Sequence, residues 1–337
     1  MQVTNDYTQL KLLIVGCGSI GKRHTQVLLE LGMKNVTVCD PSEKQREEMS
    51  VLFPSVRIES NYEEALKKGS FDAVFILTPT AMHVDMATQA LESGCHVFIE
   101  KPISNSQKGV DLLKELAQEK GLLIMVGFCF RYHEVLKKAK KLLKDGTVGR
   151  LVNVRAFMGE PFAEIQPNYM NMYYSKYSGA FELVHDLDLA IWFAEQDIDE
   201  VYSVYGSFSD MGMESPDSIE FLLKFRDRLA ANVHLDFYQH PRRRQIELMG
   251  VKGTITVEFA SWDKAVLSWY NTDTRRWQIE EFITARNDMF RDEDEDFLLA
   301  VIGKRELTCT VDEALKSLRV IEQVYSIPEK IYKIKQV

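Results

Sequence analysis

The stretch that decides the fold is residues 11–21, KLLIVGCGSIG, in which a short apolar run leads into a glycine-rich loop. The apolar residues before Gly16 predict a strand that is buried on both faces, as in a parallel sheet. The loop has the spacing GxGxxG, and helical periodicity begins directly after it. Because strand, loop and helix follow in this order, the loop is predicted to bind the pyrophosphate of a dinucleotide. A glycine-rich turn without a ligand is the alternative interpretation.

Each residue of the loop has a predicted part in holding the cofactor. Gly16 allows the tight turn, Gly18 lets the backbone approach the pyrophosphate, and Gly21 lets the helix pack against the strand. Ser19 and Ile20 stand at the N-terminus of the helix, where free N–H groups and the positive end of the helix dipole attract phosphates.

Asp40 ends the second predicted strand, about 20 residues beyond the loop, where the fingerprint places an acidic residue. A carboxylate there accepts hydrogen bonds from the ribose hydroxyls and repels a 2′-phosphate, so NAD is the expected cofactor. NADP stays open as an alternative, because Lys44 or Arg46 could turn toward a phosphate. Asp40 could also be only a turn residue before Pro41.

Strand and helix patterns alternate through residues 1–127, which predicts an α/β Rossmann domain with a doubly wound parallel sheet. From about residue 150, strand-like segments follow one another with tight connections. This change predicts that residues 128–337 form an α+β domain on a mostly antiparallel sheet, whose C-terminal helix can pack back on the first domain. The predicted strands cover residues 11–15, 36–39, 73–77, 96–99, 122–126, 151–157, 201–208, 218–225, 229–238, 245–249 and 254–259.

Composition and charge narrow the class of partner. Lys plus Arg number 41 and Asp plus Glu 50, a net charge of −9, so a nucleic-acid partner is not expected. No apolar run reaches about 18 residues, so no membrane partner is expected. The five cysteines lack metal-binding spacing and the N-terminus lacks signal-peptide features, so we expect a cytoplasmic protein without a metal. The arginine run at 242–244 (RRR) is predicted to be a solvated strand end or an oligomer salt bridge. The acidic run at 292–296 (DEDED) is predicted to be a solvated helix N-terminus.

Two further segments leave the carboxyl ends of predicted strands, where the nicotinamide would lie. Pro102 restricts the lysine before it, which is consistent with a tightly positioned ammonium, and a surface lysine in a charged turn is an equally good interpretation of this segment alone. The first segment also carries a histidine on the first turn of a helix, where closing a loop is the commoner role. The predicted cofactor contacts of these segments are Thr78, Pro79, His83, Glu100 and Lys101.

The strings GCGSIGKRH (16–24), TPTAMHVDMATQALESGCHVFIEKP (78–102) and GFCFRYH (127–133) together resemble the glucose–fructose oxidoreductase / inositol dehydrogenase (Gfo/Idh/MocA) family. The resemblance continues through SGAFELVHDLDLAIWF (178–193) and TVDEALKSLRVIE (310–322). It implies a large open sheet in the second domain, whose exposed face often makes subunit contacts, so a homodimer or homotetramer is expected.

The resemblance also implies an activity. It points to an NAD(P)-dependent dehydrogenase or reductase that acts on CH–OH groups, exchanging a hydride with a secondary hydroxyl or ketone of a sugar, cyclitol or sugar derivative. A non-catalytic dinucleotide-binding regulator of the same fold is the alternative.

By the same resemblance, Lys101 is the active-site lysine and His185 is the family's histidine at the start of a helix in the second domain. Many members carry an aspartate four residues before this histidine, where this chain has Phe181. Glu182, three residues before it, matches a branch with an H-E-x-D-like string. His185 is suited to take the hydroxyl proton, Lys101 to hydrogen-bond the same oxygen, and Glu182 or Asp186 to hold the tautomer of the imidazole.

The segment at 166–176 is rich in tyrosine and asparagine, which suit a polyhydroxylated ligand. We expect it to line the substrate pocket, although a surface loop at an oligomer interface is nearly as good an interpretation. The predicted substrate contacts are Arg131, Tyr169, Tyr173 and Asp186.

Overall fold

The computed structural model describes residues 6–172, 176, 178–261 and 263–326. The chain divides into two compact units. The first holds the residues up to Asp145 together with Phe259–Leu267 and Ile279–Leu315, and the second holds Gly146–Glu258, Ser268–Gln278 and the residues from Lys316 on.

The first unit is built on a six-stranded sheet with the order β3-β2-β1-β4-β5-β6, in which all paired strands are parallel. The order reverses between β1 and β4, which is the switch point at which doubly wound sheets bind their ligands. The predicted Rossmann-like sheet is therefore confirmed, with β3 as a strand that the sequence analysis did not predict. The strands are β1 (Lys11–Val15), β2 (Asn35–Cys39), β3 (Arg57–Glu59), β4 (Ala73–Ile76), β5 (His96–Glu100) and β6 (Ile124–Gly127).

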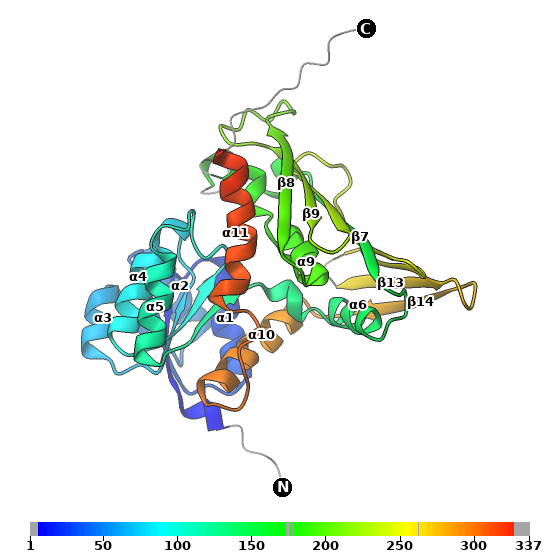
Figure 1. Cartoon of the computed structure of the whole chain (residues 1–337). Helices are drawn as coiled ribbons and strands as arrows, with labels where there is room; N and C mark the ends of the chain where they lie inside the picture. Colours follow the sequence, from blue (N-terminus) through cyan, green and yellow to red (C-terminus); the bar gives the residue numbers. More distant parts are fainter. Residues whose placement is uncertain (1–5, 173–175, 177, 262, 327–337) are drawn as a thin grey trace. The chain divides into compact units, whose positions relative to one another are not determined.

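Helices cover both faces of this sheet (Figure 1), because the right-handed crossovers on the two sides of the switch point run in opposite directions. α4 packs beside α5 on one face, and α1 packs beside α10 on the other. The helices of this unit are α1 (Ser19–Glu30), α2 (Glu43–Leu52), α3 (Tyr62–Lys68), α4 (His83–Glu92), α5 (Val110–Lys120), α6 (Glu134–Lys144) and α10 (Asp288–Val301), with short 3-10 turns η1 (Asp6–Gln9), η2 (Thr80–Met82) and η3 (Cys129–Tyr132).

Two helices of this unit, α2 and α3, begin directly after a capping residue. Ser42 accepts a hydrogen bond from the N–H of Gln45, and Asn61 accepts one from the N–H of Glu64 at 3.0 Å. α5 begins at Val110. Residue 109 is a glycine with φ of +83°, a left-handed conformation that interrupts the helix.

The second sheet has eight strands in the order β14-β13-β12-β11-β7-β10-β9-β8 and belongs mainly to the second unit, although parts of β13 and β14 fall in the first. β7 and β10 run parallel, while β7–β11, β9–β10 and β8–β9 are antiparallel, so the prediction of a mostly antiparallel sheet is confirmed. β13 and β14 were not predicted. The strands are β7 (Leu151–Gly159), β8 (Ile198–Gly206), β9 (Ser218–Phe225), β10 (Leu229–Asp236), β11 (Arg243–Gly250), β12 (Gly253–Phe259), β13 (Lys264–Asn271) and β14 (Arg276–Ile283).

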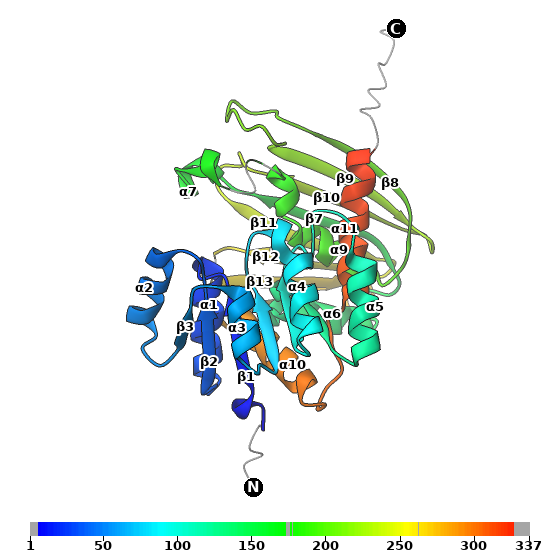
Figure 2. The same ribbon diagram turned by 90° about the vertical axis from the view of Figure 1, so that its left-hand side faces the viewer.

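The two faces of this sheet differ because side chains alternate along each strand. On β9, Ile219, Phe221, Leu223 and Phe225 are buried, while Leu222 between them is exposed. α9 (His185–Ala194) packs against β7 and β10 and so covers one face (Figure 2). The remaining helices of the described residues are α7 (Phe162–Ile165) and α11 (Val311–Ser326), and the remaining 3-10 turns are η4 (Tyr169–Asn171) and η5 (Gly179–Glu182).

The acidic run at 292–296 corrects a prediction, because it is not a solvated helix N-terminus. Glu293, Asp294 and Asp296 are buried inside α10. Asp296 accepts hydrogen bonds from Tyr132 at 2.7 Å and Arg305 at 2.7 Å. Since Tyr132 is far away in the sequence, the local charge pattern gave no sign that these carboxylates are paired.

Within the described part of the chain, no helix is both long enough and apolar enough to cross a bilayer.

Candidate functional site

The Asp40 carboxylate, which follows β2, accepts two hydrogen bonds from backbone N–H groups, one of them in the glycine loop. Its Oδ2 accepts the N–H of Cys17 and its Oδ1 accepts the N–H of Ser42, at 2.8 Å each. An ionised carboxylate has about four acceptor positions, so this half-buried side chain keeps about two for ribose hydroxyls. Arg46, the possible partner of a 2′-phosphate, donates to the carbonyls of Asp40 and Pro41, at 2.8 Å each.

Two glycines of the loop leave no room for a side chain. Gly16 has φ of +96°, and a Cβ there would lie 2.5 Å from the carbonyl oxygen of Leu77. A Cβ on Gly21 would lie 1.9 Å from the carbonyl oxygen of Gly16. The close approach of β1, α1 and the residue after β4 therefore requires glycine at both positions.

Gly18 differs from these two, because nothing lies within 4 Å of the position that a Cβ would take. Gly18 is also the N-cap of α1, which has no side-chain cap, and Ser19 and Ile20 form the first turn. The first N–H groups of a helix have no partner within it, so those of α1 can reach a phosphate. An open, uncapped helix start beside a free carboxylate position fits a dinucleotide.

His83 begins α4 and links the loops that follow β4 and β5. Its Nε2 lies 2.8 Å from the carbonyl oxygen of Thr78, and its Nδ1 lies 2.9 Å from that of Pro102. Burial lowers the pKa of His83, so the neutral ring donates to only one of these carbonyls at a time. These contacts give His83 a structural part in fixing the loop that carries Lys101.

The predicted cofactor residues after β4 and β5 share one edge of the sheet. Glu100 ends β5 and Lys101 follows it, and both side chains are half-buried. Thr78 and Pro79 follow β4, the neighbouring strand, with Thr78 half-buried and Pro79 exposed. Because parallel strands end at the same edge, these residues and the glycine loop after β1 lie at the carboxyl edge of one sheet.

The second unit carries the other predicted catalytic residues. Glu182 ends η5 and His185 is the first residue of α9, and both side chains are half-buried. Phe181 is buried, and its ring stacks on that of Tyr325 at 4.2 Å and meets that of Phe221 at 6.0 Å. The position where the resemblance implies an aspartate is thus filled by a packing residue, and Glu182 is the carboxylate that precedes His185 in this segment.

The arginine run at 242–244 corrects a second prediction. Arg244 is buried, and its Nη2 donates to Oδ2 of the buried Asp186 at 2.7 Å. Arg242 pairs with Glu160 at 3.3 Å, and only Arg243 is exposed. A solvated strand end or an oligomer contact is therefore wrong for Arg244, because alternation along β11 turns its side chain to the covered face. The sequence held no signal for this pairing, since 58 residues separate the partners.

Three of the four predicted substrate contacts, Arg131, Tyr169 and Asp186, are described, and each side chain interacts with another part of the protein. Arg131 is buried and forms an ion pair with Glu313 at 3.2 Å. The hydroxyl of Tyr169 donates to the carbonyl of Met211 at 2.6 Å. Tyr173 lies outside the described residues. With Asp186 held by Arg244, the substrate roles of these residues stay predictions.

One group of side chains in the described chain has the composition of a metal site. His24, Glu293 and Asp294 are all buried, and they offer ligand atoms within 4.8 Å of one another. His24 Nδ1 lies 2.7 Å from Asp294 Oδ1, and the rings of Phe98 and Phe290 flank the imidazole. Burial raises the pKa of Glu293 well above its usual value, and the nearby carboxylate of Asp294 adds to this effect. A buried histidine–aspartate pair beside a third buried carboxyl group accounts for the cluster.

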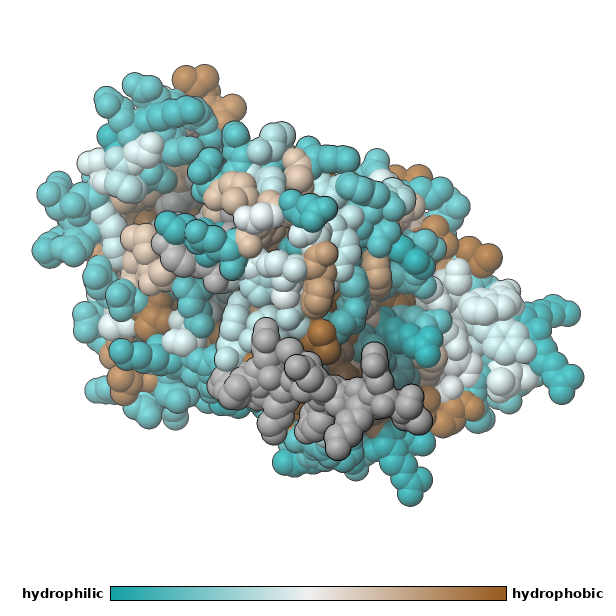
Figure 3. Space-filling view, turned by 90° about the horizontal axis from the view of Figure 1, so that it is seen from above, coloured by the Kyte–Doolittle hydropathy of each residue, from teal (hydrophilic) through white to brown (hydrophobic). Residues whose placement is uncertain are grey.

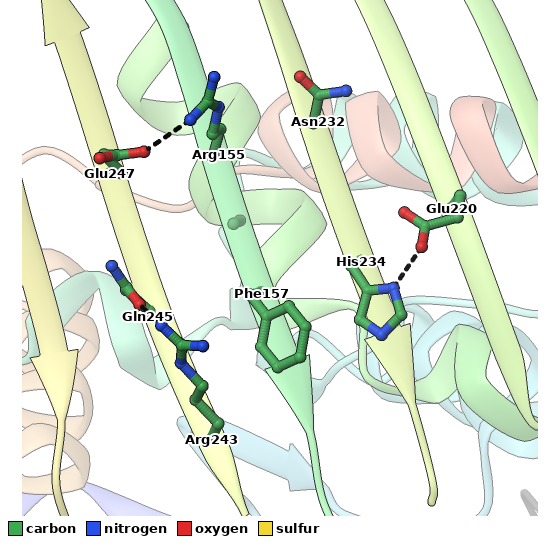
Figure 4. Close-up of a pocket in the computed structure, with 9 residues that line it drawn as sticks. Arg155, Phe157, Glu220, Asn232, His234, Arg243, Gln245 and Glu247 are labelled. Atoms are coloured by element: carbon green, nitrogen blue, oxygen red, sulfur yellow. Dashed lines mark hydrogen bonds and ion pairs between the residues drawn. The ribbon is translucent and has the colours of Figure 1, made fainter. Parts of the chain in front are cut away.

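The open face of the second sheet contains a hollow of about 480 Å³ (Figure 4). The ring of His234 stacks on that of Phe157 at 4.6 Å, and the guanidinium of Arg243 lies 5.6 Å from the same ring. Burial lowers the pKa of His234, but hydrogen bonds to Asp236 and Glu220 outweigh it and raise the pKa to about 9. The hollow therefore places two cations and a carboxylate around one aromatic ring.

Comparison with known sequences decides the family. Residues 10–128 match a family described as an oxidoreductase family with an NAD-binding Rossmann fold, and residues 136–256 match the GFO/IDH/MocA C-terminal domain. The chain belongs to the Gfo/Idh/MocA family. It is an enzyme of the oxidoreductase class, and its first unit carries the family's NAD-binding domain.

Individual Gfo/Idh/MocA proteins resemble most of the chain. An uncharacterised oxidoreductase of Bacillus subtilis, YrbE, is 26% identical over 91% of both chains. The scyllo-inositol 2-dehydrogenase (NAD(+)) of the same organism is 29% identical over 57% of this chain and 56% of its own length. A levoglucosan dehydrogenase solved with NADH and levoglucosan has the same fold, with a TM-score of 0.84, 17% identity and coverage of 94% of this chain and 96% of its own.

Proposed function

We propose that this protein is an NAD-dependent dehydrogenase or reductase of a secondary hydroxyl or ketone on a sugar, cyclitol or sugar derivative. The observation that carries the proposal is that this chain keeps both Lys101, after β5 at the ligand edge of the Rossmann sheet, and His185, at the start of α9. Relatives named for inositol and levoglucosan support the substrate class. The relatives named above give no support to the alternative of a non-catalytic regulator.

The proposed chemistry divides between the side chains. NAD, when bound, supplies the hydride acceptor at its nicotinamide ring. The His185 imidazole takes the proton of the substrate hydroxyl, because its ordinary pKa lies close to neutral pH. The Lys101 ammonium donates a hydrogen bond to the same oxygen and stabilises its developing negative charge. Glu182, the carboxylate before His185, orients the imidazole.

The proposal is tested directly by adding candidate substrates to the purified protein. With NAD, we expect absorbance at 340 nm to rise with at least one member of a panel that includes scyllo-inositol, myo-inositol and levoglucosan. With NADH and the matching ketone, the absorbance should fall. Dinucleotide binding with no redox change across a broad panel of sugars and cyclitols would favour the regulator.

The preference for NAD is proposed to depend on the charge of Asp40. We expect Asp40→Asn to raise the ratio of kcat/KM for NADP over NAD at least about tenfold, because the amide no longer repels a 2′-phosphate. The amide oxygen can still accept one backbone hydrogen bond, so the change isolates the charge. Steady-state kinetics with both dinucleotides measures the ratio.

Asp72 provides the matched control for Asp40. It accepts the N–H of Lys11 at 2.7 Å, at the amino end of β1 rather than the carboxyl end. Asp72→Asn should leave the NADP/NAD ratio unchanged. An unchanged ratio in Asp40→Asn would remove the support for the ribose contact.

We further propose that the open face of the second sheet binds a second copy of this chain. Tyr202 pairs with Leu222 across β8 and β9, and both side chains are exposed. The same face carries Arg155 and Arg243 together with Glu220, so it has the charges of both signs that a self-complementary interface needs. In the view of Figure 3, hydrophobic residues lie in separate groups among hydrophilic ones. Sedimentation equilibrium should give a dimer or tetramer for the native chain and a smaller species for Leu222→Asp; a native monomer would refute the interface.

A further inference from the structure

The start of α9 has an unusual polar arrangement. Val184 is the N-cap and has no side-chain cap, and the rest of the helix is almost entirely buried. Asp186 and Asp188 lie in its first turn, with exposed fractions of 0% and 1%. A buried helix start cannot rely on bulk water, so its first turn must be fixed by protein groups.

Arg244 supplies this fixed point from the sheet. It lies opposite Met158 in the β11–β7 ladder, so its backbone belongs to the centre of the eight-stranded sheet. Its Nη2 donates to Asp186 Oδ2 at 2.7 Å, with exposed side-chain fractions of 3% and 0%. A charge-assisted hydrogen bond that is closed to water is strong and directional, so the ion pair fixes the first turn of α9.

The surrounding charges show that Asp186 has a partner of its own. Arg242 and Glu160 form a second ion pair beside it, and both Arg242 and Arg244 attract the Asp186 carboxylate. Burial raises the pKa of Asp186, while Arg244 opposes this effect. The carboxylate next in sequence to His185 is therefore engaged with the sheet.

We infer that Arg244 and Asp186 are positioning residues, whose ion pair holds the first turn of α9 so that the His185 imidazole keeps its working orientation. The inference rests on the proposed function of His185, and it gives Asp186 a positioning role, shared with Arg244, in place of the predicted substrate contact. Small displacements of a catalytic group reduce turnover strongly, by about a hundredfold for a shift near 1 Å. The ion pair thus contributes to kcat rather than to cofactor affinity.

The test compares Arg244→Lys, Arg244→Met and Asp186→Asn with Arg226→Met. Arg226 forms an exposed ion pair with Asp197 at 2.9 Å in the same unit, so it controls for loss of an arginine–aspartate pair in general. We expect kcat to fall about a hundredfold in Arg244→Met and at least tenfold in the other two, with KM for NAD changed less than twofold. Arg226→Met should match the native enzyme. Arg244→Lys and Asp186→Asn keep the test valid if Arg244→Met does not fold.

A second readout needs no substrate. The C2–H resonance of His185, identified by its loss in His185→Ala, reports the pKa of this imidazole by NMR. Asp186→Asn removes the negative charge that is nearest to His185 in the sequence and leaves Arg244 positive. The midpoint of the His185 titration should therefore fall by about half a pH unit or more. Loss of packing alone predicts no shift of this sign.

The outcomes separate the inference from the proposed function. The inference would be overturned if Arg244→Lys and Asp186→Asn fold, keep kcat within threefold of Arg226→Met and leave the midpoint of the His185 titration unchanged. This result counts against the inference alone as long as His185→Ala is inactive. If His185→Ala turns over like the native enzyme, the catalytic assignment of His185 itself is wrong. Lower kcat with unchanged KM for NAD and a lowered midpoint supports the positioning role.

Discussion

Replacing Lys101 with methionine is expected to lower kcat by about a thousandfold while the Kd for NAD changes less than threefold. Methionine keeps most of the length and apolar stem of lysine but cannot donate a hydrogen bond or carry a charge. The proposed function uses the ammonium to stabilise negative charge on the substrate oxygen, which develops only in the transition state. The loss should therefore appear in turnover rather than in cofactor binding.

Isothermal titration with NAD and steady-state rates at saturating NAD separate these two effects. Lys68→Met is the matched control, because Lys68 forms an exposed ion pair with Glu64 at 2.7 Å on α3. The control should keep native rates. If Lys101→Met loses affinity for NAD and turnover by equal factors, the lysine serves cofactor binding and the assigned role is wrong.

Replacing His185 with asparagine is expected to lower kcat by about a hundredfold to ten-thousandfold at pH 7. Asparagine can hydrogen-bond but cannot accept a proton in this range. In the direction of alcohol oxidation, the native rate should decrease at pH values below the pKa of the imidazole. The protonated ring no longer accepts the substrate proton there. This acid limb should vanish in His185→Asn, so the remaining rate no longer depends on that ionisation.

A pH–rate profile from about pH 5 to 9 measures both features. His240→Asn is the control, since this exposed histidine lies 3.6 Å from Glu164 in the same unit and has no proposed role. It should keep the native rate and the native acid limb. An acid limb that persists unchanged in His185→Asn would show that another group accepts the proton.

The first unit could be predicted well because its signals are local. The apolar run before Gly16, the caps at Ser42 and Asn61, and the glycine spacing each act within a few residues. Gly16 and Gly21 could be assigned from spacing alone, and the contacts with Leu77 and Gly16 give the steric reason. The three-residue strand β3 is too short for a periodic pattern, so it was missed.

The features that could not be predicted depend on partners far away in the chain. Asp294 was assigned to solvent because it stands in an acidic run, but its partner His24 comes from α1. Arg244 was assigned to a solvated strand end because its neighbours are also basic, but its partner in an ion pair, Asp186, comes from α9. A run of like charges in the sequence predicts solvent-exposed side chains. The prediction is wrong where the fold places an oppositely charged partner beside them, because the paired charges can then be buried.

We propose that the Lys101 ammonium and the His185 imidazole act on one substrate oxygen, and a double-mutant cycle on kcat tests this proposal most directly. Lys101→Met, His185→Asn and the double variant are compared with the native enzyme under the same saturating conditions. Groups that act as a unit give a double variant little worse than the poorer single variant. We predict this result. Losses that multiply, so that the double variant falls by the product of the two single factors, would contradict the account.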